Sequence, residues 1–459
     1  MVEMTRSNDL GGLSPVGPAG EMGLLPAGGD VRELQRKLGV AAKRSPGRRF
    51  HALYDRIWRS DVLQEAWRRV QRNKGAAGVD KQTLAAVQEY GVIRLLGELQ
   101  RDLRQGSYRP APVRRVEIPK PQGGKRPLGI PTVRDRICQQ AARIVVEPIF
   151  EADFLDVSYG FRPGRKALDA KEVVRRSFID GHQFCFEADI RNYFSEIDHE
   201  RLLGLVADRV SDRRVLKLIR QWLQAGVMTE DGMLRRTVAG TPQGGVISPL
   251  LSNIYLQALD QAFVDGAHGT LVRYADDFVV ICRSEPEARA VQQLAGEVLA
   301  GLGLELHPEK TKVVDLREGR EGFDFLGCHF RARVSGRMLE RGVRRYYLQR
   351  WPSQRAMKRV RGKVKAKTGR GRAGQDLREI IADLNPVLRG WGNYFRTGNA
   401  AKKFNQIDWY VVGRLRGLML KRYGRNLRAG QSSLWTREFF EAHGLYRLRG
   451  TVRYPGVAL

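Results

Sequence analysis

The sequence predicts an α+β fold with strands in the middle of the chain and helices towards both ends. Apolar residues recur at helical spacing between residues 31 and 104, as expected for amphipathic helices. Short apolar runs bounded by turn residues predict strands near residues 114–130, 183–190 and 271–283. After residue 331 the pattern becomes arginine-rich and mostly helical. A chain of 459 residues with this pattern is long enough for several domains.

Other segments are assigned from local composition. Residues 1–50 are predicted to be a flexible leader, because Gly, Pro and other small residues fill the first 30 positions with weak periodicity. Residues 200–225 are predicted to be one helical segment, and residues 311–330 are strand-like. A loose stretch is expected near residues 363–374, within the basic region.

The charge of the chain is strongly positive and unevenly spread. The formal net charge is +30, and the sequence pI is about 10.4. Residues 331–459 hold 31 Lys and Arg against 7 Asp and Glu, which is +24 of that total. Such a field indicates a polyanionic partner, and nucleic acid is the usual one. No apolar run approaches the ~18 residues of a membrane span, and no signal peptide is evident. We therefore expect no membrane contact and a cytoplasmic location.

The cysteine pattern carries no metal or disulfide signature. No two of the four cysteines form a CxxC pair, so neither a zinc site nor a disulfide framework is indicated. Small buried core residues in a reducing cytoplasm are the simpler interpretation. The four are Cys138, Cys185, Cys282 and Cys328.

Acidic residues follow two of the predicted strands. Asp189 ends an apolar run, and Asp276 and Asp277 lie at the bend of a predicted hairpin. Adjacent carboxylates repel each other unless a cation lies between them. Nucleotidyl transfer is an in-line displacement that two divalent ions can promote, and Mg²⁺ prefers carboxylate oxygens. A polar turn is the alternative interpretation, since aspartate is common in turns.

Three segments resemble the motifs of reverse transcriptases. Tyr-Ala-Asp-Asp at residues 274–277 resembles the YxDD box, and residues 189–194 resemble the first catalytic motif, an aspartate followed five residues later by an aromatic. Residues 241–250 resemble the PQG box. Finer features resemble one branch, the bacterial group II intron-encoded reverse transcriptases, or maturases. They lie at residues 118–121, 126–131, 159–165, 308–311, 325–327 and 390–395.

This resemblance implies a right-hand polymerase. It places an N-terminal extension and fingers in residues 51–180, and a palm with an antiparallel sheet in residues 181–330. A helical thumb and a basic maturase region would follow in residues 331–459. The implied activity is RNA-directed DNA synthesis from dNTPs with two Mg²⁺ ions. The implied partners are the group II intron RNA, whose splicing and retromobility the protein would assist, and an RNA template with a DNA primer or target DNA. A bacterial ribonucleoprotein is the expected setting.

The resemblance also implies roles for individual residues. Asp189, Asp276 and Asp277 would hold both metal ions. Phe194 would lie beneath the incoming sugar and exclude a 2′-OH, although an ordinary core aromatic is the alternative. Lys310 would donate a proton to the leaving pyrophosphate, or else be a solvated lysine. The nucleotide contacts would be Lys120, Arg126, Arg114, Phe194, Gln243 and Ile190.

Contacts to RNA are expected from cations and aromatics in two regions. Aromatic rings among cations suit stacking on bases, but packing of the helical core is the competing interpretation for the aromatics. The candidate RNA-binding residues are Arg162, Arg165, Trp391, Tyr394, Lys402 and Lys403.

Two other functions remain open at this point. One is an RNA-binding splicing cofactor whose polymerase site is idle. The intact set of three aspartates argues against it, since clustered carboxylates are costly without a cation. The other is a reverse transcriptase that serves defence or a retron. The long basic region that contains residues 390–395 favours the intron branch instead.

Overall fold

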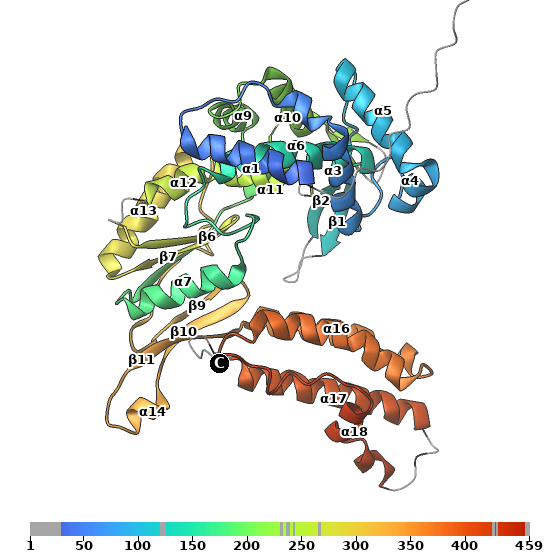
Figure 1. Cartoon of the computed structure of the whole chain (residues 1–459). Coiled ribbons are helices and arrows are strands. Elements are labelled where there is room, and N and C mark those ends of the chain that lie inside the picture. The colour runs from blue at the N-terminus through green and yellow to red at the C-terminus, as the bar shows by residue number, and fades with distance from the viewer. Residues whose placement is uncertain are drawn as a thin grey trace, which may run out of the picture.

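The computed structural model describes residues 29–119, 125–229, 233–235, 239–241, 244–264, 268–424, 427 and 430–454. Two candidate nucleotide contacts, Lys120 and Gln243, lie outside the described residues, and so does the side chain of Arg126. Figure 1 shows a helical upper body, a central sheet region, and a lower arm of long helices that projects from it.

The upper body is built around one buried helix, α6. Most of its residues are buried, because α1, α3 and α5 pack around it and α11 lies beneath (Figure 1). Helix α1 falls inside the predicted leader, so the leader prediction is wrong for these residues: Val31, Leu34 and Leu38 are buried against the body. The helices here are α1 (Gly29–Arg44), α2 (Tyr54–Ile57), α3 (Ser60–Arg72), α4 (Leu84–Tyr90), α5 (Val92–Gln105) and α6 (Val133–Glu151).

A hairpin beneath this body confirms the strands predicted near residues 114–130. Strands β1 and β2 pair antiparallel from Arg114↔Ile130 to Pro119↔Lys125. Two short strands extend them into a sheet of order β2-β1-β4-β5. The strands are β1 (Val113–Pro119), β2 (Lys125–Ile130), β4 (Val227–Met228) and β5 (Leu234–Arg235).

The central sheet is antiparallel and has the order β6-β7-β3-β8. Its strands alternate between two hydrophobic cores, as period-two side-chain geometry requires. Phe186, Phe278 and Val280 enter the upper core with helix α13, whereas Cys185 and Val279 enter the lower core with helix α7. The elements are α7 (Ala167–Ile179), β3 (Phe184–Asp189), β6 (Thr270–Tyr274), β7 (Asp277–Cys282), α13 (Glu285–Gly301) and β8 (Lys312–Asp315).

The helix predicted over residues 200–225 is two helices, α9 and α10, so that prediction is wrong in its middle. The break occurs because buried Asp212 caps α10 and also accepts hydrogen bonds from the amides of Leu53 and Tyr54, at 3.0 and 2.9 Å. The helices between the strands are α8 (Tyr193–Glu196), α9 (His199–Ala207), α10 (Arg213–Gln224), α11 (Ser248–Tyr255) and α12 (Gln257–Ala262).

A second sheet, of order β11-β10-β9, joins the central region to the lower arm. The mostly helical prediction after residue 331 missed strand β11 and the end of β10. These strands form because alternate residues such as Phe330, Ala332 and Leu348 enter the lower core. The elements are β9 (Gly322–Phe325), β10 (Cys328–Val334), α14 (Gly336–Leu339) and β11 (Tyr346–Pro352).

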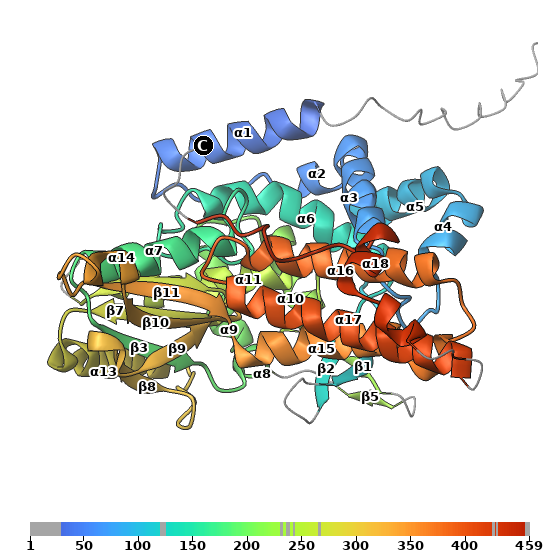
Figure 2. The ribbon, with the colours of Figure 1, turned by 90° about the horizontal axis from the view of Figure 1, so that it is seen from below.

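Three long helices form the lower arm and lie side by side in Figure 2. Helix α15 continues to Lys367, so the loose stretch is shorter than predicted. The four cysteines are buried and free, as predicted. In the described part of the chain, no helix has the length and apolar character needed to cross a membrane. The helices are α15 (Gln354–Lys367), α16 (Leu377–Phe395), α17 (Ala401–Tyr423) and α18 (Arg437–Ala442).

We expect Asp212→Ala to lower the free energy of unfolding by about 3 kcal/mol, since it leaves buried amides without an acceptor and removes a helix cap. Asp198→Ala is the matched control, because exposed Asp198 caps α9 through a single bond to the Arg201 amide. The control should lose about 1 kcal/mol. Urea unfolding of both variants tests this, and equal losses would contradict the role given to Asp212.

Candidate active site

The β6–β7 hairpin turns within two residues and is supported from below. Tyr274 pairs with Asp277 across the bend, and Ala275 adopts a left-handed φ of 59°. A side chain at Gly160 would collide with the backbone nitrogen of Ala275. The segment that contains Gly160 also bonds to strand β6, where the Tyr159 amide donates to the Arg273 carbonyl at 2.9 Å. The shape of the bend therefore depends on a close backbone approach that a glycine permits.

A buried arginine holds the same bend in place. Arg273 is fully buried and forms an ion pair with Asp260, in which Nε donates at 2.6 Å. The guanidinium also donates to the Ala275 carbonyl at 2.9 Å and to Asn253 at 3.1 Å. Asn253 in turn donates to the carbonyl of Gly160 at 2.8 Å. One charged group thus connects strand β6, helices α11 and α12, and the bend itself.

The three aspartates come together at one end of the central sheet. Strands β3 and β7 pair in the register Asp189↔Asp277, and Asp276 precedes Asp277 in the bend. Desolvation by surrounding protein raises the pKa of Asp277 to about 7, and the charges of Asp276 and Asp189 act in the same direction. Because the side chain of Asp277 is exposed to solvent, desolvation is the weaker of these two explanations. The repulsion among the carboxylates is the better explanation for the raised pKa of Asp277. A nearby cation would relieve this repulsion.

Lys310 already supplies one positive charge to this cluster. Its Nζ lies 2.6 Å from Oδ2 of Asp189, and both side chains are partly exposed. The loop that carries Lys310 is fixed by the His307 amide, which donates to the Asp189 carbonyl at 2.8 Å. This pairing joins residues that are 121 positions apart in the chain.

The donor set fits Mg²⁺ by its chemistry, because all three side chains offer hard carboxylate oxygens. However, the three carboxylates are not arranged around one metal position. Among the described residues, no group of three or more His, Cys, Asp or Glu side chains could hold a metal ion. One Asp189 oxygen is instead engaged by Lys310. The structure thus brings the right residue types to one sheet edge but shows no assembled metal site.

Phe194 lies on the short helix that follows Asp189. Its ring is half-buried, with its centroid 5.0 Å from that of Tyr193. The Thr241 amide donates to the Phe194 carbonyl at 2.8 Å, which joins the start of the PQG-like loop to this helix. Ile190 is buried, and its backbone bridges to Leu306. The Phe194 side chain also packs against the upper hydrophobic core.

The candidate phosphate-binding cations receive little direct support. Arg114 donates twice to the carbonyl of Ala77, at 3.1 and 2.8 Å, so its guanidinium braces a loop of its own chain. Arg126 lies opposite Ile118 on the β1–β2 hairpin. Lys125, which precedes Arg126 in β2, pairs with Glu117 at 2.9 Å.

One of the candidate RNA contacts is a structural residue instead. The Arg162 side chain is 3% exposed, and its donors are used by the Glu151 carboxylate and by the carbonyls of Ser158 and Phe154. We therefore correct this assignment, because the guanidinium has no free face for RNA. Trp391 packs against Phe395 and Phe404, with ring centroids 5.1 and 5.4 Å away, but it is half-buried and stays a prediction.

The other candidate RNA contacts remain accessible to different degrees. Arg165 forms an ion pair with Asp156 and keeps 26% of its side chain exposed. Lys402 is exposed and Lys403 half-buried in the first turn of α17. Tyr394 has a local role that the sequence did not predict.

Tyr394 connects the lower arm to the aspartate cluster. Its hydroxyl donates to the Leu326 carbonyl at 2.9 Å, and the backbone of Leu326 hydrogen-bonds the Asp277 carboxylate. Leu326 and Gly327 both have left-handed φ values, 49° and 73°, so they form a tight turn. Buried Lys171 lies 4.0 Å from the Tyr394 ring centroid, and burial lowers the pKa of Lys171. No sequence motif pointed to this chain of contacts.

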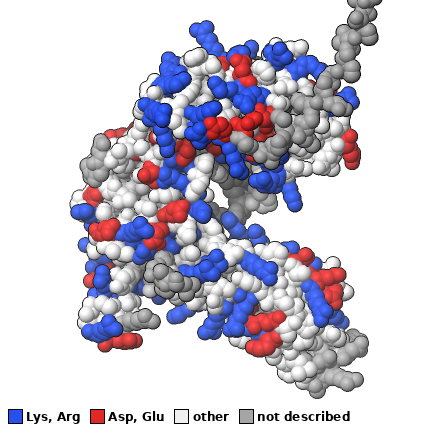
Figure 3. All heavy atoms as spheres, viewed as in Figure 1, with Lys and Arg blue, Asp and Glu red and all other residues white. Residues whose placement is uncertain are grey.

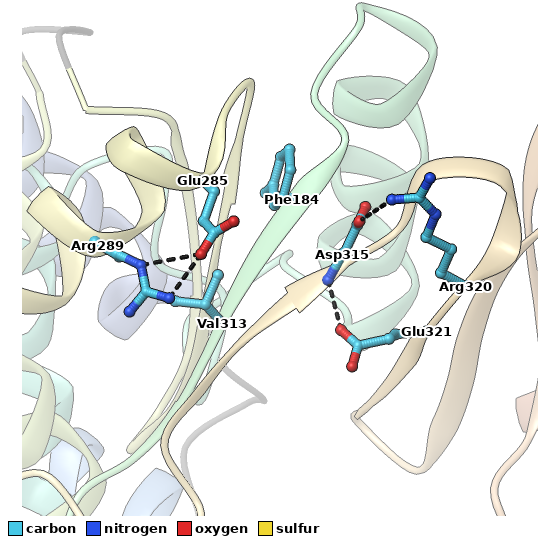
Figure 4. A pocket seen from close by; sticks show the side chains of 7 residues that line it. All are labelled: Phe184, Glu285, Arg289, Val313, Asp315, Arg320 and Glu321. Carbon is cyan, nitrogen blue, oxygen red and sulfur yellow. Dashed lines mark hydrogen bonds and ion pairs between the residues drawn. The ribbon is translucent and has the colours of Figure 1, made fainter.

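A hollow and a pocket mark different parts of the surface. Figure 3 shows the molecule hollowed between the upper body and the lower arm, with Lys and Arg on both walls. A pocket of about 390 Å³ lies elsewhere, beside Phe184, which begins the strand that Asp189 ends. Its charged groups pair mainly with one another, as Arg289 does with Glu285 at 2.6 Å (Figure 4). The pocket is therefore not part of the aspartate site.

Comparison with known proteins agrees with this geometry. A family model for reverse transcriptase (RNA-dependent DNA polymerase) matches residues 118–330, and a model for the group II intron maturase-specific domain matches residues 357–435. Protein YkfC of Escherichia coli K12 is 37% identical over 343 residues, covering 65% of this chain and 87% of YkfC. The group II intron-encoded protein LtrA of Lactococcus lactis is 40% identical over 215 residues, covering 46% of this chain and 35% of LtrA.

The first match and the palm-like sheet define the class of protein: a reverse transcriptase, which is an RNA-directed DNA polymerase. The maturase-specific match and the coverage of YkfC then identify the family. The chain belongs to the group II intron-encoded reverse transcriptases/maturases. This confirms the family and the α+β polymerase fold predicted from the motifs, whereas the boundaries of the fingers, palm and thumb remain predictions.

We expect Tyr394→Phe to slow the maximal rate of DNA synthesis roughly five-fold, since the lost hydrogen bond contributes about 1 kcal/mol. The apparent affinity for primer–template should not change. The control is Tyr410→Phe, because Tyr410 is half-buried in α17 and its hydroxyl bonds no described residue. Steady-state primer extension measures both quantities, and equal rates for the two variants would rule out the connection.

Proposed function

We propose that this protein copies RNA into DNA by two-metal nucleotidyl transfer at Asp189, Asp276 and Asp277, and that it also binds the group II intron RNA. The observation that carries the proposal is the strand register that sets Asp189 opposite Asp277, with Asp276 in the adjoining bend. Adjacent strand ends are rigid supports for such ligands. When bound, two Mg²⁺ ions would stabilise the attacking and leaving oxygens of the displacement.

The remaining residues have proposed roles at this site. Phe194 discriminates against the 2′-OH of ribonucleotides, and its place five residues after Asp189 with a half-buried side chain supports that role. Lys310 lies 2.6 Å from Asp189, within the aspartate cluster, and this position supports its proposed role as proton donor. Lys120, Arg126 and Gln243 stay proposed nucleotide contacts on the strength of their motifs.

The proposed RNA partner is supported by charge and by the maturase-specific match. That match spans helices α15 to α17, in which α15 alone carries seven basic residues and no acidic one. Lys402, Lys403 and Arg165 are the accessible members of the predicted RNA-binding set. Assistance in splicing and retromobility, and a bacterial ribonucleoprotein as the setting, follow as proposals from this partner.

A non-catalytic splicing cofactor is the second candidate, and one observation favours it. The three carboxylates are not arranged around one metal position, and Asp189 forms an ion pair with Lys310 instead. Primer extension by the purified protein on an RNA template separates the two candidates. Synthesis with Mg²⁺ supports the polymerase, whereas no extension with Mg²⁺ or Mn²⁺ would favour the cofactor.

We expect Asp276→Asn to reduce DNA synthesis by more than about 10³-fold, since loss of a metal ligand removes several kcal/mol of charge stabilisation. RNA affinity should be unchanged, because one carboxylate contributes little to the basic surface. Asp180→Asn is the control, since it removes the same charge from an exposed position at the end of α7. Retention of synthesis by Asp276→Asn would remove the metal assignment.

We expect Phe194→Ala to lower the preference for dNTPs over rNTPs by at least about 10-fold, since the ring no longer fills the space of the 2′-OH. Phe439→Ala removes another half-buried ring, from α18, and serves as the control. The ratio of kcat/KM for the two nucleotide classes is the measurement. An unchanged ratio would reduce Phe194 to a core residue.

A further inference from the structure

Residues 331–352, here called the arginine hairpin, lie between the two regions that the family models match. One match ends at residue 330 and the other begins at residue 357. The hairpin includes most of β10, helix α14 at the tip, and β11. It contains seven arginines and a single acidic residue, Glu340. No function is assigned to this segment by either match.

Four exposed arginines of this hairpin lack carboxylate partners. Arg333, Arg341, Arg344 and Arg345 are exposed, and none of them forms an ion pair with any described Asp or Glu. Some exposed arginines elsewhere on the molecule do have such partners: Arg36 pairs with Glu33, Arg94 with Glu98, and Arg289 with Glu285. Others, such as Arg32 and Arg44, also form no ion pair with a described residue, so the missing partners alone do not distinguish the hairpin. The hairpin is distinguished by having four such arginines close together, with positive charge that no described carboxylate neutralises.

Aromatic rings support three of these guanidinium groups. Arg333 lies over the Trp351 ring at 4.8 Å from its centroid. Arg345 lies over Tyr347 at 5.5 Å, and Arg344 over Tyr346 at 5.9 Å. A guanidinium stacked on a ring keeps its N–H edge available and is restricted in its rotamers. Such an edge matches the paired oxygens of a phosphate group.

The strand pairing gathers much of this chemistry on one face of the sheet. Arg333 pairs with Tyr347, and His329, four pairs along the strands and on the same face, pairs with Trp351. The opposite face is mostly apolar, because Phe330, Ala332 and Leu348 enter the lower core, although buried Arg350 also lies on it. One face of the hairpin thus anchors it to the protein, and the other face combines cations with aromatic rings.

The hairpin lies away from the hollow between the upper body and the lower arm. Its tip, helix α14, is at the lower left of Figure 1, whereas the long helices α16 and α17 extend to the right. Basic side chains are visible at this lower left end of the space-filling view in Figure 3. A nucleic acid that touches the tip would therefore run along the outside of the molecule.

We propose that the arginine hairpin is a second RNA-binding surface, which holds the phosphate backbone of a folded RNA while the hollow holds the template and primer. This proposal rests on the RNA partner proposed above and specifies where part of that RNA is held. The occupant is RNA because unpaired guanidinium edges on aromatic supports match phosphates along a backbone. The surface would let the protein keep its intron RNA while copying a different segment.

The test uses the whole protein with its hollow already filled by an RNA template and DNA primer. The probe is a closed RNA stem-loop with a blocked 3′ end, which cannot serve as a primer. The variant is the triple substitution Arg341→Gln, Arg344→Gln and Arg345→Gln. The control triple, Arg36→Gln, Arg94→Gln and Arg289→Gln, removes the same charge from exposed, ion-paired positions. Probe affinity is measured by fluorescence anisotropy across a salt series.

We expect the hairpin triple to bind the stem-loop at least about 10-fold more weakly than the control triple. Its plot of log affinity against log salt should be shallower by about 2 to 3, which corresponds to three lost phosphate contacts. Primer extension should be the same for both. A second triple, with Lys at the same three positions, should restore the salt slope but not the full affinity, because lysine keeps the charge without the stacked planar fork.

Several results would overturn the proposal. One is equal stem-loop affinity for the hairpin and control triples. Another is a matching loss of primer–template binding, which would make the hairpin part of the hollow. A third is unchanged RNA affinity with lost binding to phosphatidylserine vesicles, which would make the partner a lipid surface. If the wild type binds no stem-loop at all, the proposed RNA partner fails as well, whereas binding that the hairpin triple leaves intact defeats this proposal alone.

Discussion

The ion pair between Arg273 and Asp260 determines the geometry on which the active site depends. Both side chains are completely buried, so the pair is tolerable only because the guanidinium donors are also satisfied by Asn253 and by the Ala275 carbonyl. Breaking one partner would leave an uncompensated buried charge, which commonly costs about 3–5 kcal/mol. The bend that carries Asp276 is thereby fixed from below rather than by its own turn residues. This explains how Ala275 can hold a left-handed backbone without being glycine.

The central sheet adds a second constraint, because it has a hydrophobic core on each face. Phe186 and Val280 belong to the core with α13, while Cys185 and Val279 belong to the core with α7. A one-residue slip of strand β3 would exchange these faces and also separate Asp189 from Asp277. The packing that stabilises the sheet therefore also sets the register of the carboxylates. One oxygen of Asp189 is paired with Lys310 in this arrangement.

Elements and motifs could be predicted from the sequence where the local hydrophobic pattern and the chemistry of the residues agreed. The hairpin around Asp276 was predictable because two apolar runs flank a turn, and the family followed from ordered motifs. Strand β11 was missed because its buried residues include a charged one, Arg350, which bonds the Lys171 carbonyl at 3.0 Å across the fold. Arg162 was misassigned because composition cannot distinguish an exposed side chain from one that long-range packing buries. Tyr394 and Leu326 are 68 residues apart, and no local signal links them.

The contacts of Tyr394 limit how the lower arm can move. The Lys171 ammonium lies 4.0 Å from the centroid of the Tyr394 ring, the tyrosine hydroxyl donates to the Leu326 carbonyl, and Phe395 beside it lies close enough to Gly327 to meet any side chain placed there. An arm fastened in this way cannot swing freely about its base. If the lower arm closes on a duplex, it would have to bend farther out along its helices. The end of the growing strand would then keep a constant distance from the carboxylates. During translocation, the duplex would then move past the base of the arm and the aspartates, while these parts of the protein stay in place.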